Sequence, residues 1–210
     1  MINLQVQTPT EGWIRSFQEL LKTKDINEGW LWKDDTLCIE ILDPGSLDQF
    51  HIDFPMDQSV LQEYNQFMIT GENGESVQAE HQIYHYRLFK YLWNINQIDY
   101  IIQTLREKPT RKRAIAIGID QPKDMTTDIY PCMIYLWVVI QHGKLNLHIH
   151  FRANDAYKKI LMDFNVGITI MKYIAQCLNV PVGTYTHIVD SLHFYEIDKW
   201  AVEMLQKKFI

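Results

Sequence analysis

Apolar and polar positions alternate in two neighbouring stretches of the chain, and this pattern predicts a β-hairpin. Residues 133–140 are mostly aromatic or β-branched, which is typical of a buried strand. A turn at residues 141–144 then leads into a second alternating stretch. It places Leu145, Leu147, Ile149 and Phe151 on one face and Asn146, His148, His150 and Arg152 on the other. We therefore expect one face to contribute to the core and the other to line a polar surface or cavity.

The rest of the chain mixes helical and extended patterns. Apolar residues at helical spacing predict helices over residues 10–23, 60–69, 97–107 and 165–178, and a last one from about residue 198. Short apolar runs predict strands within 29–54 and over 114–119 and 184–189. Because the elements show no regular β-α-β rhythm, we expect an α+β fold. A chain of 210 residues supports one well-buried core, so a single domain over residues 1–210 is expected.

Charge and composition restrict the possible partners. The net charge is −6, so there is no general attraction to nucleic acid or anionic membranes, and any phosphate site must be local. The three cysteines fit neither a disulfide framework nor a paired-thiol zinc site, which indicates a reducing compartment. No apolar run has the length of a membrane-spanning helix, and the N-terminus lacks a signal-peptide pattern. We expect a cytoplasmic protein without nucleic-acid or membrane partners.

Cys132 is the candidate nucleophile. It follows a proline at the head of the strand 133–140. A cysteine in this place is either a small apolar core residue or a reactive thiol, and a reactive thiol needs positive charge nearby. If the hairpin is regular, Arg152 returns to the level of Cys132 and supplies that charge.

Three other groups each have two interpretations. His148 and His150 project from the same strand face, either as the wall of a polar cavity or as the start of a zinc site, although no acidic spacing completes a metal-binding set. Glu63 is either an exposed helix residue or a buried acid for proton transfer. The cationic run at 111–113 is either a solvated loop or a phosphate clamp.

An ordered series of short motifs gives these candidates a context. The series is Pro131-Cys132, Gly143-Lys144-Leu145, Arg152-Ala153-Asn154-Asp155, Phe164-Asn165, Val182-Gly183 and His187 to Tyr195. In this combination and order, the motifs resemble the thymidylate synthase superfamily, which includes thymidylate synthases and pyrimidine nucleotide hydroxymethylases. The resemblance covers about half of the chain, is strongest from Lys112 to Tyr195, and is weaker upstream at Glu63 and Tyr84.

The resemblance implies a fold and a reaction. The fold would be a mixed sheet flanked by helices, with two subunits packed sheet to sheet in a homodimer. The reaction would be a one-carbon transfer from 5,10-methylenetetrahydrofolate to carbon 5 of a pyrimidine nucleoside monophosphate, without a metal. Cys132 would add to carbon 6 of the ring and so make carbon 5 nucleophilic. Glu63 would organise water and proton transfer, and Tyr84 would match the family's cavity tyrosine.

The same positional match assigns the substrate contacts. Arg152 would hold the phosphate, with Lys112 and Arg113 reaching the phosphate of the partner subunit's site. Asn165 would read the pyrimidine edge, and Asp155 would face the folate. The sugar hydroxyl would be held by His193 and Tyr195.

Departures from the family pattern bear on the type of reaction. Met133 stands where the family has histidine, Ala153 where it has serine, and Lys112 where it has arginine. The last two changes are similar to ribonucleotide-type CMP hydroxymethylases. No match is found to the N-terminal phosphate-binding arginine segment, the cofactor-side tryptophans or the C-terminal segment that closes over folate.

A hydroxymethylase admits water to an intermediate that a methyl-forming enzyme shields, so a missing closing segment favours hydroxymethylation of CMP or dCMP. Asn165 argues against cytosine as the base, because its side-chain amide can also hydrogen-bond the edge of uracil. Three alternatives stay open: thymidylate synthase acting on dUMP by reductive methylation, a noncatalytic nucleotide-binding relative, and a zinc hydrolase built on His148 and His150.

Overall fold

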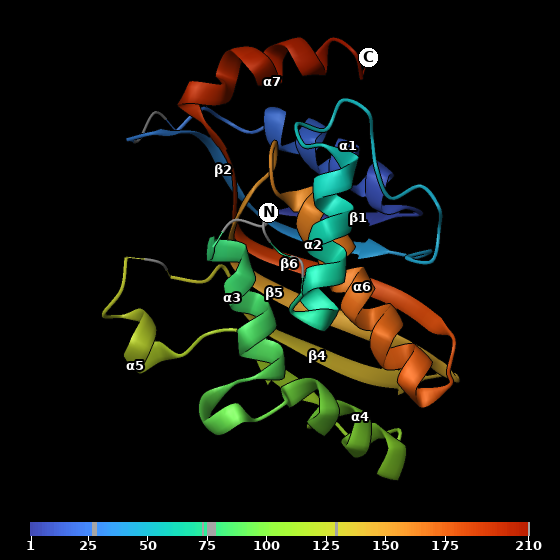
Figure 1. Cartoon of the computed structure of the whole chain (residues 1–210). Coiled ribbons are helices and arrows are strands. Elements are labelled where there is room, and N and C mark those ends of the chain that lie inside the picture. The colour runs from blue at the N-terminus through green and yellow to red at the C-terminus, as the bar shows by residue number, and fades with distance from the viewer. Residues whose placement is uncertain (27–28, 73, 75–78, 129, 210) are drawn as a thin grey trace.

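A six-stranded mixed sheet forms the centre of the molecule (Figure 1). The computed structural model describes residues 1–26, 29–72, 74, 79–128 and 130–209. In the sheet the strands lie in the order β1 (Ile2–Val6), β2 (Leu31–Ile41), β6 (Val182–Tyr195), β5 (Lys144–Asp155), β4 (Met133–Gln141) and β3 (Ile115–Ile117). The pairs β1–β2 and β5–β6 are parallel, and the other pairs are antiparallel. This arrangement confirms the predicted α+β class.

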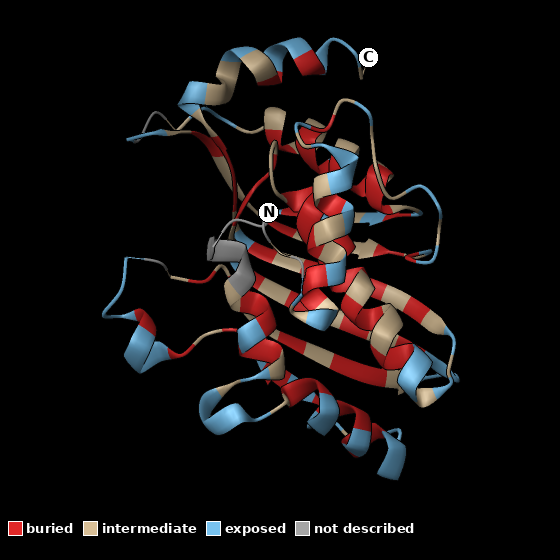
Figure 2. Cartoon of the chain, in the orientation of Figure 1, coloured by how far each residue is buried: buried red, intermediate tan, exposed pale blue. Residues whose placement is uncertain are grey.

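The longer helices lie on one side of this sheet (Figure 1), and they are α1 (Pro9–Leu21), α2 (Gln58–Thr70), α3 (Ala79–Phe89), α4 (Gln97–Glu107) and α6 (Ile160–Leu178). Of these, α1, α3, α4 and α6 contact the strands, and α2 packs on α6 and α3. The short helices are α5 (Gln121–Asp124), α7 (Lys199–Gln206) and the 3-10 turns η1 (Leu92–Asn94) and η2 (Glu196–Asp198). Buried residues follow the contact between sheet and helices (Figure 2). In the described part of the chain, every helix is too short or too polar to cross a lipid bilayer.

The predicted hairpin is confirmed. Strands β4 and β5 are joined by a tight turn in which His142 and Gly143 take positive φ angles of 50° and 74°, a conformation that glycine adopts without strain. Leu147 and Ile149 are buried against the helices, whereas His148 and His150 are half-buried on the opposite face. The alternation in sequence therefore separates a core face from a polar face.

Helix α6 differs from its expected position in a way that affects the site. The apolar spacing predicts a helix from residue 165, but α6 begins at Ile160. The cause is Asp155, whose Oδ1 accepts hydrogen bonds from the backbone N–H groups of Tyr157 (2.8 Å) and Lys158 (3.0 Å) and turns the chain directly from β5 into the helix. Asn165 consequently lies inside α6 rather than at its start.

A buried ionic cluster holds the segment that leads to Cys132. Arg87 on α3 forms ion pairs with Asp120 (3.3 Å), which directly precedes the short helix α5, and with Asp124, the last residue of that helix. All three side chains are buried. Tyr91 adds a hydrogen bond from its hydroxyl to the carbonyl oxygen of Ile119 (2.8 Å). Helix α3 is thereby tied to the loop between β3 and β4. The pattern of apolar positions in the sequence predicts none of β1, α3 and α5.

Candidate active site

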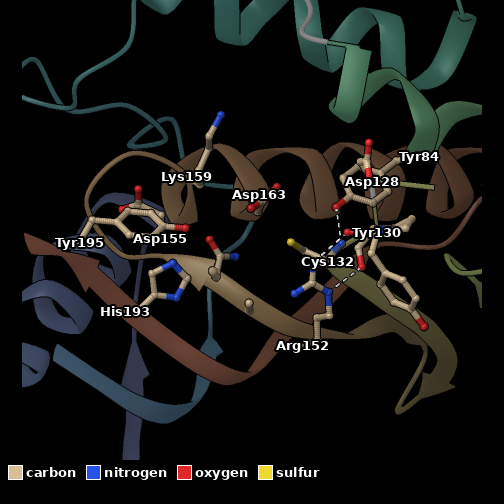
Figure 3. A pocket seen from close by; sticks show the side chains of 13 residues that line it. Tyr84, Asp128, Tyr130, Cys132, Arg152, Asp155, Lys159, Asp163, His193 and Tyr195 are labelled. Atoms are coloured by element: carbon tan, nitrogen blue, oxygen red, sulfur yellow. Dashed lines mark hydrogen bonds between the residues drawn. The ribbon is translucent and has the colours of Figure 1, made fainter. Parts of the chain in front are cut away.

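A cavity of about 450 Å³ opens where the carboxyl ends of β5 and β6 meet the start of α6 and the segment before β4 (Figure 3). Six residues predicted from the sequence line it: Tyr84, Cys132, Arg152, Asp155, His193 and Tyr195. The lining also contains Asp128, Tyr130, Pro131, Ala153, Asn154, Lys159 and Asp163. The structure therefore brings together side chains that are spread over more than half of the sequence.

Cys132 and Arg152 lie together at one end of this cavity, as the hairpin predicted. The backbone N–H of Arg152 donates to the carbonyl oxygen of Cys132 (2.8 Å). The guanidinium donates from Nε to the oxygen of Pro131 (3.1 Å) and from Nη2 to that of Tyr130 (2.8 Å), and it stacks on the Tyr130 ring. Burial raises the pKa of the Cys132 thiol, and the positive charge of Arg152 counteracts this rise. Arg152 is thus fixed in orientation beside the sulfur.

Tyr84 on helix α3 contacts the backbone at Cys132. Its hydroxyl oxygen accepts hydrogen bonds from the backbone N–H groups of Cys132 (3.0 Å) and Met133 (3.4 Å). The ring is buried, and burial raises the pKa of the phenol well above its ordinary value. Because both of these bonds use the oxygen as acceptor, the phenolic hydrogen remains available, and a side-chain hydrogen bond from Tyr84 opposes the rise that burial causes in the pKa of the Cys132 thiol.

Asp163 lies between the two ends of the cavity (Figure 3) and was not predicted from the sequence. It stands one helical turn after Lys159 on α6, and both side chains line the cavity. Burial raises the pKa of the Asp163 carboxyl to about 7, although the Lys159 charge and a hydrogen bond from Asn154 oppose the rise. A carboxyl group that holds or releases a proton near neutral pH therefore faces the cavity.

The opposite end of the cavity carries polar groups from the ends of β5 and β6. Asp155 and His193 are register partners on these strands, and both are buried. Burial raises the pKa of the Asp155 carboxyl. His193 makes a contact of 3.1 Å from Nδ1 to the carbonyl oxygen of Ser191, while its buried Nε2 has no hydrogen-bond partner among the described residues. A buried nitrogen of this kind is suited to a ligand hydroxyl.

Four predicted site residues lie outside this cavity. Asn165 is turned into the protein, where its Nδ2 donates to the carbonyl oxygens of Gln49 and Leu161, both at 2.8 Å. Glu63 is on α2 and is absent from the cavity lining. Lys112 and Arg113 precede β3, and the Lys112 ammonium lies 5.8 Å from the ring centre of Trp137, at the half-buried face of β4. These four residues are absent from the lining of the cavity that holds Cys132.

His148 and His150 contact different partners. His150 pairs through Nε2 with Asp190 (2.9 Å), and His148 packs edge-on against Trp137. Among the described residues, no group of three or more histidine, cysteine, aspartate or glutamate side chains is placed to hold a metal ion.

Comparison with known proteins gives one consistent result. Residues 57–208 match the family model described as thymidylate synthase. The chain is 34% identical over 166 residues to the "Putative thymidylate synthase" of Methanocaldococcus jannaschii, with 75% of this chain and 72% of that protein covered. It is 32% identical over 174 residues to the protein of the same name from Methanosarcina barkeri, covering 81% and 77%. A thymidylate synthase of Bacillus subtilis subsp. natto is 27% identical over 119 residues, covering 55% of this chain and 42% of that protein.

Proposed function

The chain belongs to the thymidylate synthase family, and from this premise we propose that it hydroxymethylates carbon 5 of CMP or dCMP. Enzymes of this family transfer a one-carbon unit from methylenetetrahydrofolate to carbon 5 of a pyrimidine nucleotide. The observation that supports cytosine as the base is the position of Asp163 in the cavity, where the sequence match had placed Asn165.

Asp163 is complementary to the edge of a cytosine ring. Cytosine presents an acceptor at N3 and an amino group at C4. A protonated carboxyl donates its O–H to N3 and accepts from the amino group with its other oxygen, while an ionised one still accepts from the amino group. Uracil presents the O4 acceptor instead of an amino group, and an ionised Asp163 repels that oxygen. Because its pKa is raised to about 7, Asp163 can supply a proton near neutral pH.

Cys132 then activates the ring for the transfer. Its thiolate forms a bond to carbon 6, the displaced electrons move toward N3, and Asp163 protonates N3. Carbon 5 attacks the methylene carbon of the folate as the first methylene–nitrogen bond breaks, and N3 returns its proton to Asp163. Carbon 5 then loses its proton as the second methylene–nitrogen bond breaks, and tetrahydrofolate leaves with a proton on each of the two nitrogens. Water adds to the exocyclic methylene, and departure of the thiolate restores the ring double bond. The net reaction consumes one water and one methylenetetrahydrofolate.

Arg152 is the proposed phosphate ligand. Two carbonyl oxygens fix one side of its guanidinium, and the exposed side keeps N–H groups for an anion. The Lys112 ammonium lies over Trp137 on the half-buried sheet face, and the exposed Arg113 follows it in sequence. We include in the proposal a homodimer packed through that face, in which these two cations act on the partner subunit's phosphate.

The proposed contacts to the sugar and the folate lie at the other end of the cavity. The unpartnered Nε2 of His193 and the hydroxyl of Tyr195 are proposed to hold the sugar. Asp155 is proposed to face the folate. Glu63, on α2, keeps its proposed role in water and proton transfer, which requires it to act from outside the lining of the described cavity.

Mass spectrometry of the products tests this function. The protein is incubated with methylenetetrahydrofolate and each of CMP, dCMP, UMP and dUMP. A hydroxymethylated cytosine nucleotide with tetrahydrofolate supports the proposal, and a methylated dUMP with dihydrofolate assigns thymidylate synthase activity instead. Absence of any product, together with nucleotide binding that survives in Cys132→Ala, indicates a noncatalytic relative. Asp163→Asn is expected to shift turnover from cytosine toward uracil nucleotides.

A further inference from the structure

A line of polar side chains runs from Asp163 into an otherwise apolar core. Asn154, next to Asp163 in the cavity lining, hydrogen-bonds the Asp163 carboxyl. Its Nδ2 is also 3.4 Å from Nε2 of His187, and Nδ1 of His187 is 2.8 Å from the hydroxyl of Tyr185. His187 and Tyr185 are completely buried, and Asn154 is 4% exposed. Buried polar groups are costly unless they are hydrogen-bonded, so the four side chains depend on one another.

Packing fixes the two rings at the inner end of this line. Phe151 stacks on His187, with ring centres 4.8 Å apart and planes inclined by 23°, and Phe164 packs on it edge-on at 4.9 Å. Tyr185 lies against α6 at Gly167, where an added Cβ would be 2.4 Å from the tyrosine hydroxyl. Glycine at this position therefore allows Tyr185 to approach the helix closely enough to contact His187.

The neutral His187 ring allows two hydrogen-bonding arrangements along the line, and in the structure Oδ1 of Asn154 is buried without a hydrogen-bond partner among the described residues. Burial lowers the pKa of His187 to about 3, so the imidazole is neutral and has one donor and one acceptor nitrogen. With Asp163 ionised, the Asn154 amide donates to Asp163 and to Nε2 of His187, and Nδ1–H donates to Tyr185. With Asp163 protonated, the amide turns over and its oxygen accepts from Asp163 and from Nε2–H, while Tyr185 donates to Nδ1.

We propose that Asn154, oriented by His187 and Tyr185, is a positioning residue that holds the Asp163 carboxyl in both protonation states and so sets the preference for cytosine over uracil. This inference rests on the proposed function, because it assigns Asp163 to the base. His187 and Tyr185 are not among the cavity-lining residues, so they act on the nucleotide through Asn154.

Other groups near Asp163 must be held constant in a test. Those that interact electrostatically with it or hydrogen-bond it are Lys159 directly before α6, Tyr64 on α2, Tyr84 on α3, Cys132 before β4, Asn154 on β5 and Tyr185 on β6. Replacement of His187 leaves all of them in place. The replacement removes the partner that orients the Asn154 amide. Any change in the titration of Asp163 then reports the effect of the buried residues on that carboxyl.

The test compares His187→Phe with a matched control, His85→Phe. His85 is also buried and also stacks on a phenylalanine, Phe89, with ring centres 5.0 Å apart, but it lies outside the line. Two quantities are measured: the titration of the Asp163 carboxyl by ¹³C NMR in the free protein, and the ratio of the Kd values for CMP and UMP by calorimetry.

In His187→Phe, the titration midpoint of Asp163 is expected to rise by about one pH unit, because Asn154 loses the partner that keeps its N–H group directed at the carboxylate and so stabilises the ionised form less. The ratio of the Kd for UMP to the Kd for CMP is expected to fall about tenfold, and His187→Gln, whose amide can again bond Asn154, should restore part of both effects. An unchanged midpoint, or an equal shift in His85→Phe, overturns the proposal.

A second variant and a titration without substrate distinguish failure of this inference from failure of the proposed function. If His187→Phe does not fold, Asn154→Leu removes the amide itself and must raise the same midpoint for the proposal to stand. The NMR titration needs no substrate, so it reports on the line even if the product assay rejects cytosine nucleotides. In that case a rise in midpoint without an effect on the Kd ratio retains the positioning of Asp163 and overturns its role in base choice.

Discussion

Replacement of Asp163 by asparagine should change how the stability of the protein depends on pH. An acid whose pKa is higher in the folded than in the unfolded state takes up a proton on folding, so the free energy of unfolding falls as the pH rises between the two values. For Asp163 these are the ordinary value of 3.8 and about 7. The difference corresponds to about 4 kcal/mol, lost between roughly pH 4 and pH 8. In Asp163→Asn this loss is absent.

Urea unfolding followed by tryptophan fluorescence at several pH values measures the effect. The free energy of unfolding of Asp163→Asn minus that of the wild type should increase by about 4 kcal/mol from pH 4 to pH 8. Other titrating groups are common to both proteins and cancel in the difference. Asp128→Asn, which removes an exposed carboxyl from the same cavity, is the control. A difference that stays flat with pH would refute the assignment of Asp163 as a buried acid with a raised pKa.

Three further outcomes are expected. Arg87→Met should lower the free energy of unfolding by about 3 to 5 kcal/mol in urea, because it leaves Asp124 buried without its cation; an unchanged midpoint would contradict this. Tyr84→Phe should cost about 1 to 3 kcal/mol, since the backbone N–H of Cys132 loses its acceptor, and turnover should fall with it. Arg152→Leu should slow alkylation of Cys132 by iodoacetamide at pH 8, measured by mass, because loss of the guanidinium raises the thiol pKa further and lowers the thiolate fraction.

Much of the fold can be predicted from the sequence where one face of an element is apolar. The alternation over residues 133–152 predicts both strands of the hairpin, and with them the approach of Arg152 to Cys132. Strand β1 was not predicted. It is a short edge strand of five residues, and its pairing with β2 is a long-range contact that leaves no local pattern.

The centre of the site was harder to predict because it depends on the phase of α6. Asp163 and Asn165 are two residues apart, so they project from nearly opposite sides of a helix. The match of Phe164-Asn165 to a family motif predicts that Asn165 faces the base. In the structure, the turn at Asp155 starts the helix at Ile160, and Asp163 lines the cavity instead. The signal that points to Asp163 is a carboxyl within an apolar helical run.

The strand order also determines when this site can exist during synthesis. Strand β2 from the first quarter of the chain pairs with β6 from its end, and Ile39 lies opposite His187. In a nascent chain, the edge of β2 that pairs with β6 therefore stays without its strand partner until β6 has also left the ribosome. Contacts so distant in sequence favour slow folding. The last strand to be made carries His193 and Tyr195, so closure of the sheet and completion of the cavity are the same event.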